Sequence, residues 1–384
     1  MALFFGGPGR VQARSPCALT MTISDSTVEA GASASEKHGH STLERPRIGI
    51  VKLGAIGDVV NSLPFVNRLR DAWPEAHITW CIAPLAHKLV VGHAAVDDFL
   101  ILELRRPSQW FRHMLELRRA RFDLVIDLQR IAKSGLVARI SGAKRRLGFD
   151  RARSKESSWV FMTERIPPND APGVTVEQYL EFADHLGLPP SPTRWDLPQS
   201  TYARSDQQEP LIVINPGASK EANRWPAVYW AELCRELVEE FGASIVVTGG
   251  AEDRALASEL QQQSGVALVD SCGQYSLKES AGLFAAADLF VGGDTGPLHM
   301  AVAVGTPVVA LFGAADPART GPHGQSSRVV SHWVPCSPCR KRICLIEGHP
   351  CMRDLEVERV LEKIRETLVG RPRSGRSNVD LRAF

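Results

Sequence analysis

A glycine-rich turn could bind an anion. Residues 292–296, Gly-Gly-Asp-Thr-Gly, separate a short apolar stretch from a helix that is predicted to begin at Pro297. Proline is favoured in the first turn of a helix because its missing N–H would be unpaired there. Glycines let a ligand approach the free N–H groups of a helix start, where the helix dipole favours negative charge. The turn therefore predicts a phosphate site. His299, one turn further on, is either a structural histidine or a donor to that phosphate.

A second turn places a carboxylate after the first apolar strand. Gly54-x-x-Gly57-Asp58 follows residues 48–53. The spacing lacks the G-x-G-x-x-G fingerprint, which disfavours a bound NAD. Asp58 would lie at the start of a helix, where the dipole keeps a carboxylate ionised. Its two interpretations are an N-cap and a general base that faces a cleft.

Two later strand ends carry further candidates. Ser219, Lys220 and Arg224 follow the strand at 211–215, where two cations and a hydroxyl could bind a diphosphate leaving group. The alternative for the cations is an ordinary solvated surface. Glu252 follows the strand at 244–248 and could accept hydrogen bonds from ribose hydroxyls or cap a helix.

Four cysteines lie within sixteen residues, at Cys336, Cys339, Cys344 and Cys351. Four thiolates can supply the tetrahedral ligands of a structural zinc site. The spacing differs from the usual pair of C-x2-C motifs, so an iron–sulfur cluster and unliganded thiols are the alternatives.

Basic residues form two clusters in the first half of the chain. The alternatives for them are a solvated surface, a site for an anionic acceptor and contact with an anionic membrane surface. The clusters are Arg105, Arg106, Arg118, Arg119 and Arg121, and Lys144, Arg145, Arg146, Arg151, Arg153 and Lys155.

Composition narrows the class of protein. With 384 residues the chain is long enough for two domains. Its content of 44% hydrophobic and 23% charged residues is typical of a globular protein. A net charge of +2 argues against nucleic-acid binding. No apolar run approaches the roughly 20 residues that span a bilayer. We therefore expect a cytoplasmic protein, whose cysteines are reduced or metal-bound.

The pattern of elements predicts two α/β halves. Strands that alternate with helices indicate parallel βαβ units, whose functional loops lie at the carboxyl ends of the strands. We expect strands at 48–53, 77–82, 99–102, 123–127, 211–215, 244–248, 289–291 and 307–312. We expect helices after residue 58, kinked at Pro64, and at 227–241, 251–263, 277–286 and 297–304.

The domain boundaries follow from composition. We expect a disordered leader at 1–45, with Met21 as an alternative start, and a proline-rich linker at 191–208. These flank a first Rossmann-like domain at 46–190, and a second follows at 209–352, with the cysteine-rich segment at 336–351. A C-terminal helix at 353–370 and a disordered tail at 371–384 complete the chain.

Several motifs, taken together and in order, resemble glycosyltransferase family 9, the ADP-heptose:lipopolysaccharide heptosyltransferases. They extend over residues 47 to about 365. The matching stretches are 50–64, 122–129 with Lys133 and Ser134, 143–149, 215–218 with 224–226, and 293–299.

The resemblance implies a GT-B fold, in which two Rossmann-like domains face each other across a cleft. It implies that the first domain binds the acceptor and the second the nucleotide-sugar, with inverting transfer that requires no metal. Asp58 matches the family's proposed general base. The implied donor-binding residues are Ser219, Lys220, Arg224, Glu252, Asp294, Thr295, Gly296 and His299, and the implied acceptor-binding residues are Lys133, Lys144, Arg145 and Arg146. One departure is Asn223, where family members often have lysine. This shifts the leaving-phosphate role to Arg224 or Lys220.

The function expected from this resemblance is transfer of heptose from ADP-heptose to the inner core of lipopolysaccharide, on an anionic acceptor of the lipid A–Kdo type. The expected location is cytoplasmic, with peripheral contact at the inner face of the inner membrane. The alternatives are a family-9 transferase with another donor or acceptor, and a non-catalytic protein that binds a nucleotide-sugar or a metal.

Overall fold

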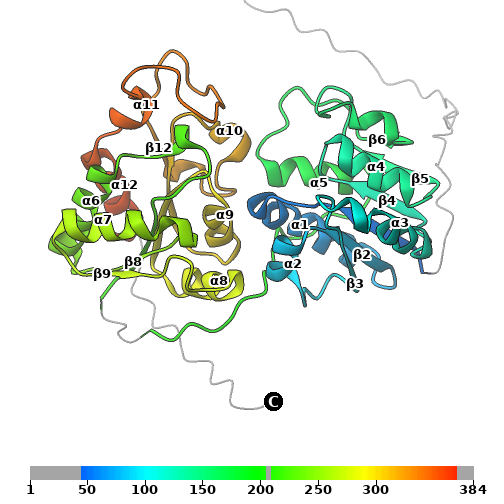
Figure 1. Ribbon diagram of the computed structural model, residues 1–384, viewed down its shortest axis with the longest axis horizontal. Coiled ribbons are helices and arrows are strands. Elements are labelled where there is room, and N and C mark those ends of the chain that lie inside the picture. Colours follow the sequence, from blue (N-terminus) through cyan, green and yellow to red (C-terminus); the bar gives the residue numbers. More distant parts are fainter. Residues whose placement is uncertain (1–44, 205–208, 370–384) are drawn as a thin grey trace, which may run out of the picture. The chain divides into compact units, whose positions relative to one another are not determined.

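The computed structural model describes residues 45–204 and 209–369, and within them two six-stranded sheets in which every paired strand is parallel. The first sheet has the order β3-β2-β1-β4-β5-β6 (Figure 1). Its strands are β1 (Arg47–Val51), β2 (His77–Ile82), β3 (Asp98–Ile101), β4 (Leu124–Asp127), β5 (Arg145–Gly148) and β6 (Glu164–Arg165). Its helices are α1 (Ile56–Ala72), α2 (Pro84–Val90), α3 (Trp110–Arg119), α4 (Ala132–Ile140) and α5 (Thr175–His185).

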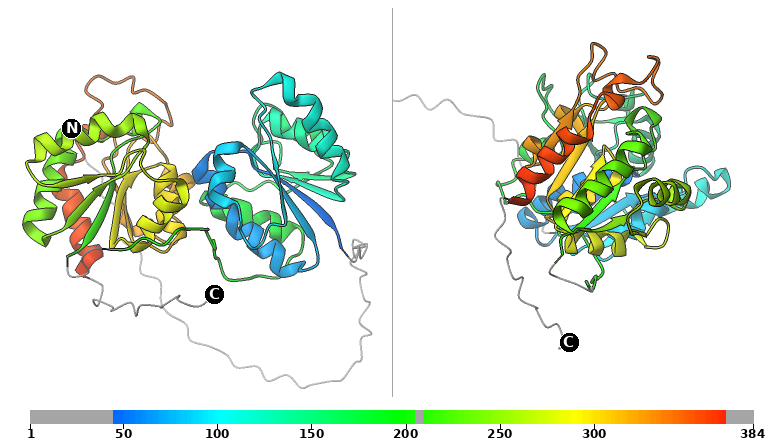
Figure 2. Two further views of the ribbon diagram at one scale, coloured as in Figure 1. Left: turned by 60° about the horizontal axis from the view of Figure 1, so that its bottom comes forward. Right: turned by 90° about the vertical axis from the view of Figure 1, so that its left-hand side faces the viewer.

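The second sheet repeats this topology, with the order β12-β11-β10-β7-β8-β9. Its strands are β7 (Leu211–Asn215), β8 (Ser244–Val247), β9 (Leu268–Asp270), β10 (Leu289–Gly293), β11 (Val308–Phe312) and β12 (Val329–Ser331). Helices lie on both faces of each sheet (Figure 2). Those of the second half are α6 (Ala227–Phe241), α7 (Arg254–Ser264), α8 (Leu277–Ala286), α9 (Gly296–Ala303), α10 (Pro317–Thr320), α11 (Pro350–Arg353) and α12 (Val357–Val369).

Both sheets therefore have the doubly wound strand order 3-2-1-4-5-6 when each is numbered from its own first strand. In this order the direction of winding reverses between the first and fourth strands, and a crevice opens beyond their carboxyl ends. These strands are β1 and β4 in the first sheet, and β7 and β10 in the second. Asp58, Lys220 and Asp294 all follow one of these four strands. The topology thus brings the predicted site residues to the two crevices.

The central strands form because their residues are apolar and are covered on both faces. All residues of β4, β7, β10 and β11 are buried, as expected for a parallel sheet between two helical layers. The expected strands in both halves are confirmed. The sequence pattern missed β5, β6, β9 and β12, which are short and lie toward the outer edges. The start of β5 is the polar run of Arg145 and Arg146, which lacks an apolar signal.

Two expected helices differ in detail. α1 extends from Ile56 to Ala72, so it begins before the expected start, and Pro64 lies buried within it. The kink expected at Pro64 stays a prediction. The helix expected at 251–263 begins as a short 3-10 turn, Ala251–Asp253, before α7.

The C-terminal helix α12 packs beside α6 and against β11 (Figure 2). Its buried face comprises Val360, Leu361 and Ile364, and this face joins the core of the second half.

Residues 186–204 form neither helix nor strand. They include most of the expected linker and the few residues before it. The predicted leader, the alternative start at Met21 and the predicted tail lie outside the described residues. Among the residues described, no helix is long and apolar enough to cross a membrane.

Candidate active site at the carboxyl ends of the strands

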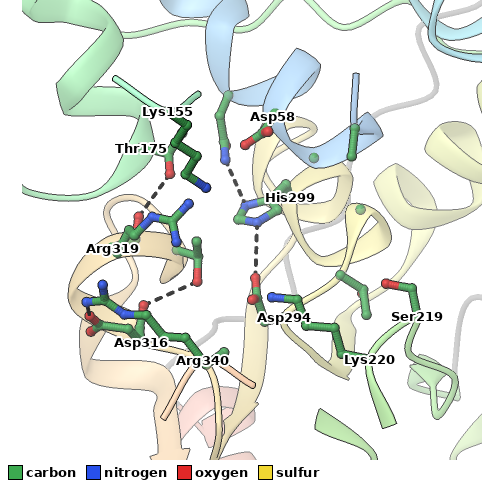
Figure 3. Close-up of a pocket in the computed structure, with 17 residues that line it drawn as sticks. Asp58, Lys155, Thr175, Ser219, Lys220, Asp294, His299, Asp316, Arg319 and Arg340 are labelled. Carbon is green, nitrogen blue, oxygen red and sulfur yellow. Dashed lines mark hydrogen bonds and ion pairs between the residues drawn. The ribbon is translucent and has the colours of Figure 1, made fainter. Parts of the chain in front are cut away.

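A cavity of about 540 Å³ lies at the carboxyl ends of the central strands and is lined by residues from both halves (Figure 3). Its volume is within the range of sites for small molecules and cofactors. Seven of the predicted site residues line it: Asp58, Ser219, Lys220, Asp294, Thr295, Gly296 and His299. Polar residues that the prediction did not assign to the site also line it: Asn61, Lys155, Thr175, Asp316, Arg319, Thr320 and Arg340.

Asp58 is a half-exposed carboxylate in the first turn of α1. The N-cap of this helix is Ala55, so Asp58 is not the capping residue. Its Oδ2 lies 3.2 Å from the Lys52 ammonium nitrogen. Burial would raise the pKa of Asp58, but the charge of Lys52 and its hydrogen bond, together with the charge of Arg130, outweigh burial and hold the pKa below its usual value. The carboxylate is therefore ionised at neutral pH and available to accept a proton.

Lys52 is the buried partner of this carboxylate. It follows β1, is only 2% exposed, and its ammonium lies 5.2 Å from the centre of the Tyr179 ring. Burial would lower the pKa of Lys52, but Asp58 and Tyr179 raise it above its usual value. Because a buried charge needs a partner, Lys52 and Asp58 stabilise each other's charged forms. Lys52 thus fixes the position of the carboxylate and is not itself a base.

A close approach of two helices places His299 opposite Asp58. A Cβ atom on Gly57 would lie 2.6 Å from His299 Cδ2, so only glycine lets α1 and α9 come this close. Asn61 Nδ2 lies 3.3 Å from His299 Nδ1, and His299 Nε2 lies 3.8 Å from Asp294 Oδ1. With Nδ1 accepting from Asn61, the ring proton is on Nε2 and faces Asp294. The second glycine of the Gly54-x-x-Gly57 turn therefore serves helix packing.

The predicted anion-binding turn leads directly into α9. This helix begins at Gly296, with Thr295 as N-cap and no side-chain hydrogen bond to its first N–H groups. The Thr295 hydroxyl instead donates to Asn215 Oδ1 at 2.9 Å, which ties β10 to β7. Thr295 and Gly296 both line the cavity. The helix start is thus free to donate to an anion in the cavity.

Cations from four separate segments surround the same cavity. They are Lys155, Lys220, Arg319 and Arg340, of which Arg340 pairs with Asp316. Partial burial together with the charges of Arg319, Arg130 and Lys220 lowers the pKa of Lys155. Like charges raise one another's energy until an anion neutralises them. Figure 3 shows Lys155, Arg319 and Lys220 arranged around the space that such an anion would fill.

Other predicted site residues do not line the cavity. Arg224 is exposed, and its Nε donates to the carbonyl of Ala218 at 3.0 Å. Glu252, Lys133 and Lys144 are also exposed. Arg145 forms two hydrogen bonds with Glu164, of 2.7 and 3.0 Å, and Arg146 donates to the carbonyls of Phe161 and Ala143. Their roles in binding remain predictions.

Sequence reasoning missed several residues for identifiable reasons. Lys155 belongs to a basic cluster that the sequence analysis identified, but the sequence did not show that Lys155 lies at the cavity. Arg319 lies in the short helix α10, and Asp316 is the N-cap of that helix. This segment has no recognisable sequence motif. Lys52 lies within a matching stretch of the family resemblance, but its burial beneath Asp58 is a tertiary contact that no sequence signal reveals.

The predicted metal centre is not assembled in the structure. Within residues 45–204 and 209–369, no group of three or more His, Cys, Asp or Glu side chains is arranged to hold a metal ion. Cys336 is exposed, Cys339 and Cys344 are half-buried, and Cys351 is buried. Burial and the neighbouring thiols of Cys344, Cys336 and Cys339 raise the pKa of Cys351 to about 11. A metal would have to displace the thiol proton in order to bind there.

Asp127, at the end of β4, predicts a pH dependence of stability. Its carboxyl accepts from the Gln129 N–H at 2.8 Å and the Ser134 hydroxyl at 2.9 Å, but burial raises its pKa from 3.8 to about 6. An acid whose folded pKa exceeds its unfolded pKa weakens folding as pH rises between the two values. The expected loss is about 3 kcal/mol between about pH 4 and 6.

Asp127→Asn removes this titration and keeps an oxygen acceptor for the Gln129 N–H. We expect the free energy of unfolding of the variant, relative to the natural protein, to rise between about pH 4.5 and 7. Urea unfolding at both pH values measures it. Parallel pH dependences of the two proteins would show that Asp127 titrates normally.

The fold and the site together define the class of the protein. Two doubly wound sheets, a cation-lined cavity at their carboxyl ends and a carboxylate held for proton transfer are the features of a GT-B glycosyltransferase. The profile of glycosyltransferase family 9 (heptosyltransferase) matches residues 110–349. The chain belongs to this family.

Known proteins agree with this assignment. The chain is 29% identical over 311 residues to lipopolysaccharide heptosyltransferase 1 of Pseudomonas aeruginosa, a match that covers 78% of this chain and 87% of the relative. The structure of a glycosyl transferase family 9 protein from Veillonella parvula has a TM-score of 0.69 and 20% identity, and covers 84% of this chain and 97% of that one. The structure of the Escherichia coli heptosyltransferase WaaC with ADP-2-deoxy-2-fluoro heptose has a TM-score of 0.62 and 22% identity. The match covers 83% of this chain and 99% of that one.

Proposed function

We propose that this protein is an inverting glycosyltransferase that moves heptose from ADP-heptose to the inner core of lipopolysaccharide. One observation carries the proposal. A single cavity brings the ionised Asp58 opposite an uncapped helix start and a group of cations. The relative named lipopolysaccharide heptosyltransferase 1 and the neighbour solved with an ADP-heptose analogue support the choice of donor and acceptor.

The reaction follows from the charges around the cavity. An acceptor hydroxyl attacks the anomeric carbon of the donor, and Asp58 accepts its proton as the new C–O bond forms. The bond between the anomeric carbon and the diphosphate oxygen breaks, and its electron pair leaves with ADP. Attack from the face opposite the leaving group inverts the anomeric centre. Because Lys52 stays protonated beside Asp58, the carboxylate is a weak base that takes the proton only as attack proceeds.

The proposed donor contacts lie on the second half of the molecule. Lys220, Ser219 and the N–H groups at the start of α9 would stabilise the charge that the departing ADP gains, as preorganised donors do by several kcal/mol. Asp294 would bind hydroxyls of the sugar, and Glu252 those of the ribose. Arg319 and Lys155 reach the same cavity and can neutralise phosphates from either substrate.

The first half would bind the acceptor, whose phosphates and carboxylates suit a basic surface. Lys133, Lys144, Arg145 and Arg146 are the proposed contacts, and Lys155 adds one at the cavity itself. We place the protein in the cytoplasm, at the inner face of the inner membrane, where such a lipid-linked acceptor would be available.

A panel of donors tests the proposal. We expect calorimetric titration to show binding of ADP-heptose, with UDP- and GDP-sugars at least about tenfold weaker. ADP alone should bind, since the diphosphate meets most of the cations. Tighter binding of a UDP- or GDP-sugar would replace heptose transfer with another reaction of the same family.

A metal at the cysteine segment is a separate proposal that the reaction does not need. Four cysteines within sixteen residues support it, with structural zinc and an iron–sulfur cluster as the alternatives. Zinc and iron analysis of the purified protein tests it, with Cys339→Ser as the comparison.

A further inference from the structure

The segment between β12 and α11 exposes an unusual group of aliphatic side chains. Ile343 is 58% exposed, Leu345 71% and Ile346 50%. We call these three residues the apolar tip. Single exposed aliphatic residues are common on protein surfaces, but a group in one short segment more often marks an interaction site. Figure 1 shows the segment as a loop without regular structure ahead of α11.

The segment is fixed to the rim of the active-site cavity. The Arg340 N–H donates to the Ala314 carbonyl at 2.7 Å, and the Ala222 N–H donates to the Arg342 carbonyl at 3.0 Å. The Arg340 guanidinium pairs with Asp316, and both residues line the cavity. Ala222 lies in the turn that follows Lys220. The apolar tip is therefore held at a fixed place beside the active site.

Exposed cations precede the apolar tip. Lys341 and Arg342 are both exposed, and neither makes an ion pair with any residue in the described parts of the chain. Glu347 is the only acid between residues 340 and 350. Aliphatic residues that enter the boundary of a bilayer, next to cations that meet anionic headgroups, are the two signals that together give stable peripheral binding.

A second copy of the chain fits this surface less well. In a two-fold interface the same patch meets itself, so the unpaired Lys341 and Arg342 would approach their own counterparts. An anionic bilayer instead neutralises them. We propose that residues 341–346 dock on an anionic lipid bilayer, with the apolar tip in the headgroup and upper acyl region and the two cations on the headgroups.

This inference deepens the proposed function and rests on it in one respect. A sugar acceptor that is anchored in a membrane remains at the bilayer surface, so a docked segment on the cavity rim would bring the active site to it. Docking itself needs neither donor nor acceptor, so it can be measured separately from transfer.

Cosedimentation with vesicles tests the proposal. We expect the protein to bind vesicles of phosphatidylcholine with phosphatidylglycerol, and to bind pure phosphatidylcholine at least about tenfold less. The triple variant Ile343→Ser, Leu345→Ser, Ile346→Ser should lose at least about tenfold in binding. The pair Lys341→Glu, Arg342→Glu should lose a similar factor while it keeps the apolar tip. Leu85→Ser with Val228→Ser, which removes exposed aliphatic residues elsewhere, is the matched control and should bind normally.

Two other outcomes would contradict the proposal. Equal binding by the triple variant would show that another surface docks. No vesicle binding, together with self-association that the triple variant loses in light scattering, would make a second copy the occupant. Near-ultraviolet circular dichroism confirms the fold of each variant. ADP-heptose titration of the triple variant should match the natural protein, so a failure of docking leaves the donor result unaffected.

Discussion

Asp58→Asn is expected to lower the rate of glycosyl transfer by about 10²- to 10⁴-fold, the usual contribution of a positioned general base. The amide keeps the shape of the carboxyl group but cannot accept the proton of the acceptor hydroxyl. Because the proposed phosphate contacts, Lys220 and the start of α9, belong to the second half of the molecule and Asp58 to the first, ADP-heptose should bind with nearly unchanged affinity. Initial rates at saturating substrates measure the first effect, and calorimetry the second.

A complication of this variant can be controlled. The Lys52 ammonium lies 3.2 Å from the carboxylate and is buried, so its charge loses a partner in Asp58→Asn. Breaking a buried pair on one side costs stability. The double variant Lys52→Met, Asp58→Asn removes both charges and should regain stability without regaining activity. Loss of donor binding in a folded variant would contradict the role of Asp58 as base.

Lys220→Ala should lower kcat/KM by about 10²- to 10³-fold, as expected for the loss of one donor to the charge that develops on the leaving group. Lys220 lines the cavity, as do Thr295 and Gly296 at the start of α9. Arg224→Ala is the matched control, because Arg224 lies four residues further on, is exposed and does not line the cavity.

The pair of variants separates two residues that the sequence could not distinguish. We expect the effect of Arg224→Ala to stay within about tenfold, through slight loosening of the turn at Ala218. Steady-state rates with varied ADP-heptose measure both variants. A larger loss in Arg224→Ala than in Lys220→Ala would mean that the loop rearranges when donor binds and that Arg224 contacts the diphosphate.

Much of the fold was predictable because its signals are local. The apolar run before Asp58 and those before Asn215 and Asp294 identify buried parallel strands, and the glycine turns after them identify the carboxyl edge of a sheet. Edge strands such as β6 and β9 were not predictable, because a strand that pairs on one side only needs little apolar sequence. The chemical types at the site, an acid after one strand and an anion-binding turn after another, also follow from the sequence.

The sequence alone determined the family and the two doubly wound halves, and it predicted Asp58, Lys220 and the Asp294 turn as site residues, which line one cavity. Tertiary structure decided the rest. It paired Asp58 with Lys52, joined α1 to α9 through Gly57 and His299, and brought Arg319 and Lys155 to one cavity while it left Arg224 outside. The physical reason is the sequence separation of the interacting residues. Strand and turn signals depend on a few neighbouring residues, whereas charge pairing and helix contact depend on packing between segments far apart in the chain.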